Sequence, residues 1–189
     1  MIRLYLTDAS SLDEAVFQRW LPRISPEKAA RLVRMPREKA KPGMAGELLV
    51  RYGMWKTFGI PPKELVTEAD GQGKPQVVSH KGVHFNISHS GSLCLCAVGD
   101  NPLGVDLQQM RNARYEQLSS RIFSAEEQAA FLAAGGTKEA FFTTWARKEA
   151  VSKLTGAGLS GFKQQAAVKY RVVLETAYRD CRLCVVCAP

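Results

Sequence analysis

Segments typical of helices and strands follow one another along this chain in an order that occurs twice. Residues 2–6 alternate apolar and polar side chains, as a strand with one buried face does. Ser25 followed by Pro26 predicts a helix start, because serine is a favoured N-cap and proline is favoured at the first helical position. A second helix is predicted from about residue 44 up to Gly59, since glycine commonly ends helices. A turn is predicted at 71–75, followed by strands at 83–87 and 93–98.

The second half of the chain repeats this order. The spacing of Ser124 and Glu127 is that of a capping box at a helix start, and a longer helix is predicted over residues 138–154. The predicted strands of this half lie at 103–107, near 168–174 and at 182–187. The repeated order predicts an α+β fold made of two similar α/β halves, at about 1–100 and 101–189.

The composition is that of an ordinary soluble globular protein, with 46% hydrophobic and 23% charged residues. No stretch approaches the ~18 uninterrupted apolar residues that a membrane helix needs, and the first residues have the pattern of a strand rather than of a secretory signal. We therefore expect a cytoplasmic protein. The five cysteines fit reduced, mostly buried thiols, because no cysteine–histidine cluster has the spacing of a zinc site.

Much of the net charge of +8 comes from one short segment. Residues 19–41 carry eight basic side chains against the two acids Glu27 and Glu38. Such a segment fits an anionic cofactor, a nucleic acid or an acidic protein partner, or it forms a solvated helix face without a ligand. A nucleic-acid-binding module is disfavoured, because few aromatic residues accompany the basic ones and no nucleic-acid motif is evident.

Two acidic side chains are candidate metal ligands. Asp106 ends a short apolar strand, where a carboxylate is rigidly placed and either binds a metal ion or caps a neighbouring turn. Glu149 and Lys153 are four residues apart on a predicted helix, and Trp145 precedes Glu149 by four, so all three share one face. One interpretation is that Glu149 and Lys153 form a surface ion pair. The other is that this largely apolar helix is packed, so that Glu149 is partly buried and needs a cation as partner.

A second group of residues has the chemistry of a phosphate site. The segment Ser88-His89-Ser90-Gly91 is predicted to be a turn between strands and offers two hydroxyl groups, an imidazole and backbone amides. We expect the cations of Lys28, Arg31 and Lys74 to lie near it. The alternative is that the histidine is only a hydrogen-bonded structural residue. Glu127 needs no role beyond its capping box.

Six short motifs occur in order along the chain. They are Ile24-Ser25-Pro26-Glu27-Lys28, Gly46-Glu47-Leu48-Leu49-Val50-Arg51, Gly73-Lys74-Pro75, Phe85-Asn86-Ile87-Ser88-His89-Ser90, Gly104-Val105-Asp106 and the helix segment from Trp145 to Lys153. In this order and at this spacing they resemble the 4′-phosphopantetheinyl transferases of the monomeric two-domain (surfactin-type) branch. The resemblance covers nearly the whole chain.

The resemblance implies an enzyme of the holo-[acyl-carrier-protein] synthase type. Its fold would be two similar α/β halves related by a pseudo-twofold axis, with the active site between them. Such enzymes use Mg²⁺ to transfer phosphopantetheine from the co-substrate coenzyme A to a serine hydroxyl of an apo acyl, polyketide or peptidyl carrier protein, and they release adenosine 3′,5′-bisphosphate. The protein would act as a monomer, without nucleic acid or membrane.

The same resemblance implies roles for individual residues. Asp106 and Glu149 would ligate Mg²⁺, and Glu149 would also deprotonate the carrier serine, directly or through water. Lys153 would contact the phosphate under attack. Coenzyme A would be held at its phosphates by Lys28, Arg31, Ser88 and His89, and at its adenine end by Gly73, Lys74 and Pro75.

Two positions depart from the family pattern. Gln108 stands where the family often has an acid, two residues after Asp106. A strand puts both side chains on the same side, so Gln108 is expected to contact the metal directly or through water while supplying one negative charge fewer. Pro42 lies near where relatives place a cation for the 3′-phosphate, and Lys41 is expected to substitute. The alternative is a non-catalytic homologue that binds coenzyme A or a carrier protein and is made inert by Gln108.

Overall fold

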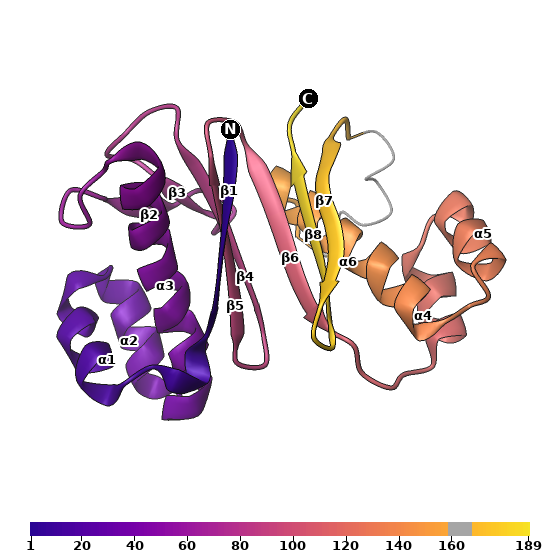
Figure 1. Ribbon diagram of the computed structural model, residues 1–189, viewed down its shortest axis with the longest axis horizontal. Coiled ribbons are helices and arrows are strands. Elements are labelled where there is room, and N and C mark those ends of the chain that lie inside the picture. The colour runs from indigo at the N-terminus through magenta and orange to yellow at the C-terminus, as the bar shows by residue number, and fades with distance from the viewer. Residues whose placement is uncertain (159–167) are drawn as a thin grey trace. The chain divides into compact units, whose positions relative to one another are not determined.

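The computed structural model describes residues 1–158 and 168–189, and contacts within the chain divide it into two compact units (Figure 1). Unit 1 is Met1–Asn101 and unit 2 is Pro102–Pro189, so the division lies one residue after the predicted one. The chain is 44% helical and 27% strand, which confirms the predicted α+β class. Among the described residues, no helix combines the length and the apolar character needed to cross a membrane.

Unit 1 is built on a three-stranded antiparallel sheet with the order β1-β5-β4. The strands are β1 (Ile2–Asp8), β4 (His84–Ser90) and β5 (Leu93–Gly99), all predicted from the sequence. All residues of the central β5 are buried, which explains its almost uninterrupted apolar sequence. The long helix α3 (Arg37–Phe58) packs against this sheet, where Val50 and Met54 share a core cluster with Phe85 and Val98 (Figure 1).

Shorter elements complete unit 1. They are η1 (Ala9–Ser11), α1 (Glu14–Trp20), η2 (Leu21–Arg23), α2 (Pro26–Arg34), β2 (Thr67–Ala69) and β3 (Pro75–Val77). Ser25 caps α2 as predicted, because its hydroxyl accepts a hydrogen bond from the backbone N–H of Lys28. Phe17 and Leu32 pack with Met44 of α3 in a second core cluster. β2 and β3 form an antiparallel hairpin around the predicted turn.

The start of α3 differs from its prediction. The helix was expected from about residue 44, but it begins at Arg37 and contains Pro42. Its first turn is polar and basic, so it lacks the apolar periodicity by which the helix was identified. Pro42 is the sixth residue of the helix, so its missing N–H removes one i→i−4 hydrogen bond. The end of the helix at Gly59 is confirmed, with this glycine in the left-handed conformation at φ 72°.

Unit 2 has a sheet of the same kind. Its antiparallel strands have the order β6-β8-β7 and are β6 (Leu103–Gln109), β7 (Arg171–Tyr178) and β8 (Cys181–Cys187). The helices are α4 (Tyr115–Ile122), α5 (Ala125–Ala133) and α6 (Lys138–Thr155). α6 packs on β6 and β8, with Ala146, Ala150 and Val151 in a core cluster with Cys184 and Val186. Helices α4, α5 and α6 enclose a separate aromatic cluster of Phe123, Phe131, Phe141 and Phe142.

The two sheets share one topology. In each unit the first strand is at one edge, the last strand is in the centre and the penultimate strand is at the other edge. This agreement confirms that the two halves are similar. The capping box of Ser124 and Glu127 and the end of α6 at Gly156 are also confirmed. The strand predicted near 168–174 was misplaced, because β7 begins only at Arg171 and continues to Tyr178.

Candidate active site

A close approach between β6 and α6 brings the predicted catalytic residues of unit 2 together. A Cβ atom built on Gly104 would lie 2.0 Å from the carbonyl oxygen of Ala150 and 2.6 Å from the backbone nitrogen of Leu154. Gly104 therefore faces α6, and only a residue without a side chain fits there. Because alternate residues of a strand share a face, Asp106 and Gln108 also point to the α6 side of the sheet.

Asp106 and Lys153 form an ion pair at this junction. The side-chain nitrogen of Lys153 lies 2.7 Å from Oδ1 of Asp106. Asp106 is 3% exposed, whereas the Lys153 side chain is 29% exposed and so reaches the solvent boundary. A buried carboxylate needs a cation or hydrogen-bond donors, and here the lysine supplies the charge. Two residues to which the sequence assigned roles in the active site, Asp106 and Lys153, are therefore in direct contact.

Glu149 lies in the electrostatic field of the same pair. Burial raises the pKa of the Glu149 carboxyl group above its ordinary value, and the charge of Asp106 raises it further, while Lys153 opposes the rise. Two carboxylates that repel one another next to a single lysine form a donor set suited to a hard divalent cation. Among the described residues there is no group of three or more histidine, cysteine, aspartate or glutamate side chains that could hold a metal ion. Such an ion would therefore need oxygen atoms from a substrate or from water, as is usual for Mg²⁺.

Gln108 is half-buried on the same face as Asp106, and its Nε2 donates a hydrogen bond to the backbone oxygen of Gln109 at 3.2 Å. This hydrogen bond to β6 itself fixes the orientation of the Gln108 side-chain amide. An amide oxygen is a neutral ligand, so the residue at this position adds no negative charge to the carboxylate pair.

A cavity in unit 1 gathers several of the residues predicted to bind coenzyme A. It has a volume of about 740 Å³ and is lined by Lys28 and Arg31 of α2 and by Gly73 and Pro75 of the β2–β3 hairpin. Phe85 and Ile87 of β4, Val50 of α3 and Ala69 of β2 supply apolar parts of its wall. The lining also includes three acids, Glu27, Glu47 and Glu68. The two cations and the apolar groups suit a ligand with both a phosphate and an aromatic ring.

The hairpin loop is fixed by Asp70. Its Oδ1 accepts hydrogen bonds from the backbone N–H groups of Gln72 and Lys74, both at 2.9 Å, and these bonds lower the pKa of the Asp70 carboxyl group. Gly73 has φ 83°, a conformation that side chains disfavour. Lys74 is half-buried, and burial lowers the pKa of its ammonium group while Asp70 opposes that change. The turn is therefore a defined structure, as predicted.

The placement of Ser88 and His89 differs from its prediction. They lie within β4, which continues to Ser90, and not in a turn between strands. Because their side chains alternate across the strand, Ser88 is buried on one face and His89 is exposed on the other. His89 shares its face with Phe85 and Ile87, which line the cavity. Proximity in sequence suggested a single cluster, but the strand separates the two side chains.

Lys41 lies elsewhere in unit 1. Its side-chain nitrogen is 3.1 Å from Oε1 of Glu38, and it donates to the carbonyl oxygen of Ser10 at 3.4 Å. Lys41 is absent from the lining of the 740 Å³ cavity. Within unit 1, the structure therefore does not bring Lys41 to the group formed by Lys28 and Arg31.

Comparison with known proteins identifies the family. A sequence model of the 4′-phosphopantetheinyl transferase superfamily matches residues 102–174, and one of the 4′-phosphopantetheinyl transferase N-terminal region matches residues 12–100. The chain belongs to the 4′-phosphopantetheinyl transferase family. The two matches meet at the boundary between the two units, so each unit corresponds to one of the two family models.

Several curated relatives carry the transferase name. The 4′-phosphopantetheinyl transferase psf-1 of Bacillus pumilus is 35% identical over 123 residues, which are 64% of this chain and 52% of that protein. The transferase Sfp of Bacillus subtilis strain 168 is 31% identical over 146 residues, 76% of this chain and 65% of Sfp. The L-aminoadipate-semialdehyde dehydrogenase-phosphopantetheinyl transferase of Xenopus laevis is 29% identical over 158 residues, 75% and 52% of the two chains. The chain spans about half to two thirds of the length of these transferases.

Three ion pairs, each with at least one buried side chain, were missed by the sequence analysis. Lys148 is 3% exposed, and its side-chain nitrogen lies 2.8 Å from Oε2 of Glu127, so the capping residue of α5 also anchors α6. In unit 1, Glu47 lines the cavity and pairs with Lys28 and Arg51. Helical spacing indicates the pair of Glu47 and Arg51, but no sequence pattern links residues that meet only in the folded chain.

Proposed function

We propose that this chain transfers 4′-phosphopantetheine from coenzyme A to a serine hydroxyl group of an apo carrier protein, with the help of Mg²⁺. The observation that carries the proposal is the gathering of Asp106, Glu149 and Lys153 at the junction of β6 and α6. Membership of the transferase family and the names of the relatives support the same reaction. The acceptor would be an acyl, polyketide or peptidyl carrier protein.

Asp106 and Glu149 would hold the metal ion through carboxylate oxygens, with Gln108 contributing its amide oxygen directly or through water. Burial, and after it repulsion from Asp106, raises the pKa of Glu149, and a divalent cation would relieve the repulsion. When bound, Mg²⁺ neutralises charge on the pyrophosphate of the coenzyme and on the leaving group.

In the proposed reaction, Glu149 is the base that accepts the proton of the serine hydroxyl group. The serine Oγ forms a bond to the phosphorus that bears pantetheine, and the bond from that phosphorus to the bridging oxygen breaks. The electron pair stays on the bridging oxygen, which leaves with adenosine 3′,5′-bisphosphate, and the serine proton goes to Glu149 directly or through water. A carboxylate oxygen within reach of the serine hydroxyl group, directly or through one water molecule, can act as this base. Lys153 would stabilise negative charge on the phosphoryl oxygens once the substrate draws it from Asp106.

Unit 1 would bind the coenzyme. Lys28 and Arg31 are placed to contact its phosphates and Gly73 and Pro75 its adenine end, since all four line the 740 Å³ cavity. Lys74 and His89 lie next to this wall on the hairpin loop and on β4, and they are proposed as further contacts. Ser88 and Lys41 are also proposed as contacts, although Ser88 faces away from the cavity side of β4 and Lys41 contacts Glu38.

The test is to incubate the purified chain with coenzyme A, Mg²⁺ and several apo carrier proteins and to weigh the carriers by mass spectrometry. We expect a mass increase of one phosphopantetheine group that disappears with EDTA and on a carrier whose target serine is alanine. Coenzyme A binding without any mass increase would instead favour a non-catalytic homologue, with Gln108 as the first residue to replace by glutamate.

A further inference from the structure

Two oppositely charged side chains of α3 are buried in unit 1, and the proposed transfer assigns them no role. Glu47 is 6% exposed and Arg51 is 8% exposed. Oε1 of Glu47 lies 3.0 Å from Nε of Arg51, one helical turn along. Both residues belong to the motif at 46–51, for which the sequence suggested no chemistry. Because ionised groups are costly to bury, a pair in this position is expected to serve the surrounding structure.

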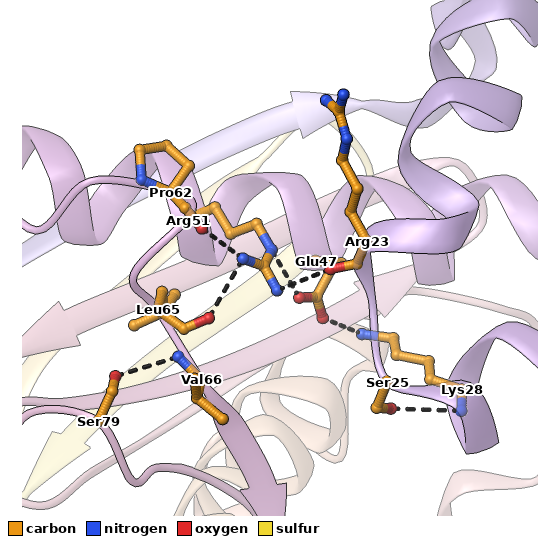
Figure 2. Close-up of polar contacts among 9 residues, drawn as sticks. All are labelled: Arg23, Ser25, Lys28, Glu47, Arg51, Pro62, Leu65, Val66 and Ser79. Carbon is orange, nitrogen blue, oxygen red and sulfur yellow. Dashed lines mark hydrogen bonds and ion pairs between the residues drawn. The ribbon is translucent and has the colours of Figure 1, made fainter.

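Arg51 ties together three segments of unit 1. One terminal nitrogen, Nη1, donates hydrogen bonds to the carbonyl oxygens of Pro62 and Leu65, and Nη2 donates to the carbonyl oxygen of Arg23 at 3.3 Å (Figure 2). Figure 2 shows that Arg23 contributes only this backbone oxygen, since its own guanidinium group points away. Leu65 lies two residues before β2, so the bonds of Arg51 hold the chain that enters the hairpin. That hairpin forms one wall of the 740 Å³ cavity.

Glu47 links Arg51 to Lys28 of α2, on the wall of the cavity that α2 forms. Its second carboxylate oxygen, Oε2, lies 2.8 Å from the side-chain nitrogen of Lys28 on α2 (Figure 2). The Lys28 side chain is 19% exposed, and both Lys28 and Glu47 line the cavity. A lysine side chain has many rotamers, and a fixed carboxylate selects those that keep its ammonium group at the cavity wall.

We propose that Glu47 is a positioning residue that presents the ammonium group of Lys28 to a phosphate of coenzyme A, and that Arg51 holds Glu47 in place. This inference rests on the proposed function, because it assumes that the cavity receives the coenzyme. The charge of Glu47 is balanced by Arg51, so the group of three retains one positive charge for an anionic ligand. The pair thus orients the lysine without cancelling its charge.

Replacing Glu47 by glutamine separates positioning from simple electrostatics, because the two predict opposite signs. Removing a negative charge beside a phosphate site would strengthen anion binding if Coulomb forces alone mattered. Loss of positioning would weaken it. A glutamine has one acceptor oxygen and an NH₂ group, so it cannot accept hydrogen bonds from Lys28 and Arg51 through separate oxygens as the carboxylate does.

The experiment measures the dissociation constant of coenzyme A by calorimetry for the full chain and for three variants: Glu47→Gln, Lys28→Met and the double variant. We expect Glu47→Gln to weaken binding about tenfold, as loss of a preorganised contact does. In the Lys28→Met background the same change should alter binding by less than about twofold, since its effect acts through the lysine. Glu14→Gln is the matched control, because Glu14 pairs with Arg37 at the surface, outside the cavity lining.

Each result distinguishes this inference from the proposed function. Tighter binding by Glu47→Gln, or an equal loss with and without Lys28, would overturn the positioning role while leaving the transfer reaction standing. Failure of the unaltered chain to bind coenzyme A would overturn both. Thermal unfolding is followed for every variant, and if Glu47→Gln is unfolded, Glu47→Asp replaces it. The aspartate keeps the charge but is one methylene shorter, so positioning predicts weaker coenzyme binding here too, and unchanged binding would contradict it.

Discussion

The two units share one sheet topology and one long packed helix, but they place their charged residues differently. In unit 1 the buried charges are on α3, in Glu47 and Arg51, and they face loops and the end of Lys28. In unit 2 the buried acid, Asp106, is on an edge strand and meets Lys153 of the helix, and the buried cation, Lys148, is on that helix and pairs with Glu127. The same architecture therefore gives one unit a cation held at a cavity and the other a pair of carboxylates.

The helices also approach their sheets in different ways. In each unit a glycine lies at the contact between helix and sheet. In unit 1 this glycine is Gly53 of the helix α3, and a Cβ atom on it would lie 3.0 Å from the ring of Tyr5 and 3.1 Å from a methyl group of Val98. In unit 2 it is Gly104 of the strand β6, and a Cβ atom on it would overlap backbone atoms of α6. Side chains can shift, whereas helix backbone cannot, so the junction in unit 2 is the more rigid one. A metal site needs that rigidity more than a cavity for a flexible coenzyme does.

The largest expected effect is on catalysis in unit 2. Asp106→Ala should lower the transfer rate about a thousandfold, because a charge that helps to stabilise the transition state is lost. The far-ultraviolet circular dichroism spectrum should be unchanged, since Lys153 can reach water once its partner is removed. The exposed Asp180, which accepts a hydrogen bond from Gln109, gives the matched control Asp180→Ala. Transfer by Asp106→Ala at the unaltered rate would exclude Asp106 as a metal ligand.

The two glycine junctions should differ in stability. Gly104→Ala should lower the free energy of unfolding by about 3 kcal/mol or more, because its methyl group would overlap helix backbone. Gly53→Ala should cost about 1 kcal/mol or less, since the gain in helix propensity offsets a contact that side chains can relieve. Gly71→Ala is the control, because no atom lies within 4 Å of its Cβ position. Urea unfolding followed by circular dichroism measures the free energy of unfolding of each variant. Equal losses of this free energy for Gly104→Ala and Gly53→Ala would contradict the difference in rigidity.

A smaller change, in the Mg²⁺ dependence of transfer, is expected at Gln108, the neutral residue on the same face of β6 as Asp106. Gln108→Glu should lower the Mg²⁺ concentration for half-maximal transfer by about three- to tenfold, because it adds an anionic oxygen beside Asp106. Gln109→Glu adds the same charge on the opposite face of β6 and should leave the Mg²⁺ dependence unchanged. The dependence is measured by carrier mass over a range of Mg²⁺ concentrations. An identical curve for Gln108→Glu and the unaltered chain would place this residue away from the metal.

The smallest difference between the units is expected for the thiols of their central strands. Burial raises the pKa of Cys94 on β5 and of Cys184 on β8 to about 12 each. Because only the thiolate reacts, both should be almost unreactive toward Ellman's reagent at pH 8, and their reaction should speed up as the pH rises toward those values. All five cysteines are buried and free, so denaturant should release five thiols. Rapid labelling in one unit alone, located by peptide mass spectrometry, would show that its sheet opens more easily.

Much of the fold could be predicted from local chemistry. Caps and glycines marked the starts or ends of helices, as at Ser25, Ser124 and Gly59, and buried strands such as β5 stood out as apolar runs. The start of α3 could not be predicted, because its polar first turn and Pro42 conceal a helix that packing supports. The start of β7 was misplaced because every residue of this strand is exposed, which removes the alternation that sets strand limits.

The candidate site could be predicted where its residues share one element or one motif. Glu149 and Lys153 follow from helical spacing, and the Gly73-Lys74-Pro75 turn follows from its composition. The pairs of Lys28 with Glu47 and of Lys148 with Glu127 could not be predicted, because tertiary packing brings each pair together across about twenty residues of sequence. Strand alternation also separated Ser88 from His89, which adjacency in sequence had grouped.

The most direct test of the account is a single-turnover experiment on Glu149→Gln with saturating coenzyme A and Mg²⁺. The amide keeps the shape of the side chain but cannot take the serine proton, and it binds the metal more weakly. We predict that the variant binds coenzyme A in unit 1 as the unaltered chain does, while the mass of the apo carrier stays unchanged over many turnover times of the unaltered chain. Conversion of the carrier by Glu149→Gln at the unaltered rate would contradict the assignment of the chemistry to the carboxylates at β6 and α6.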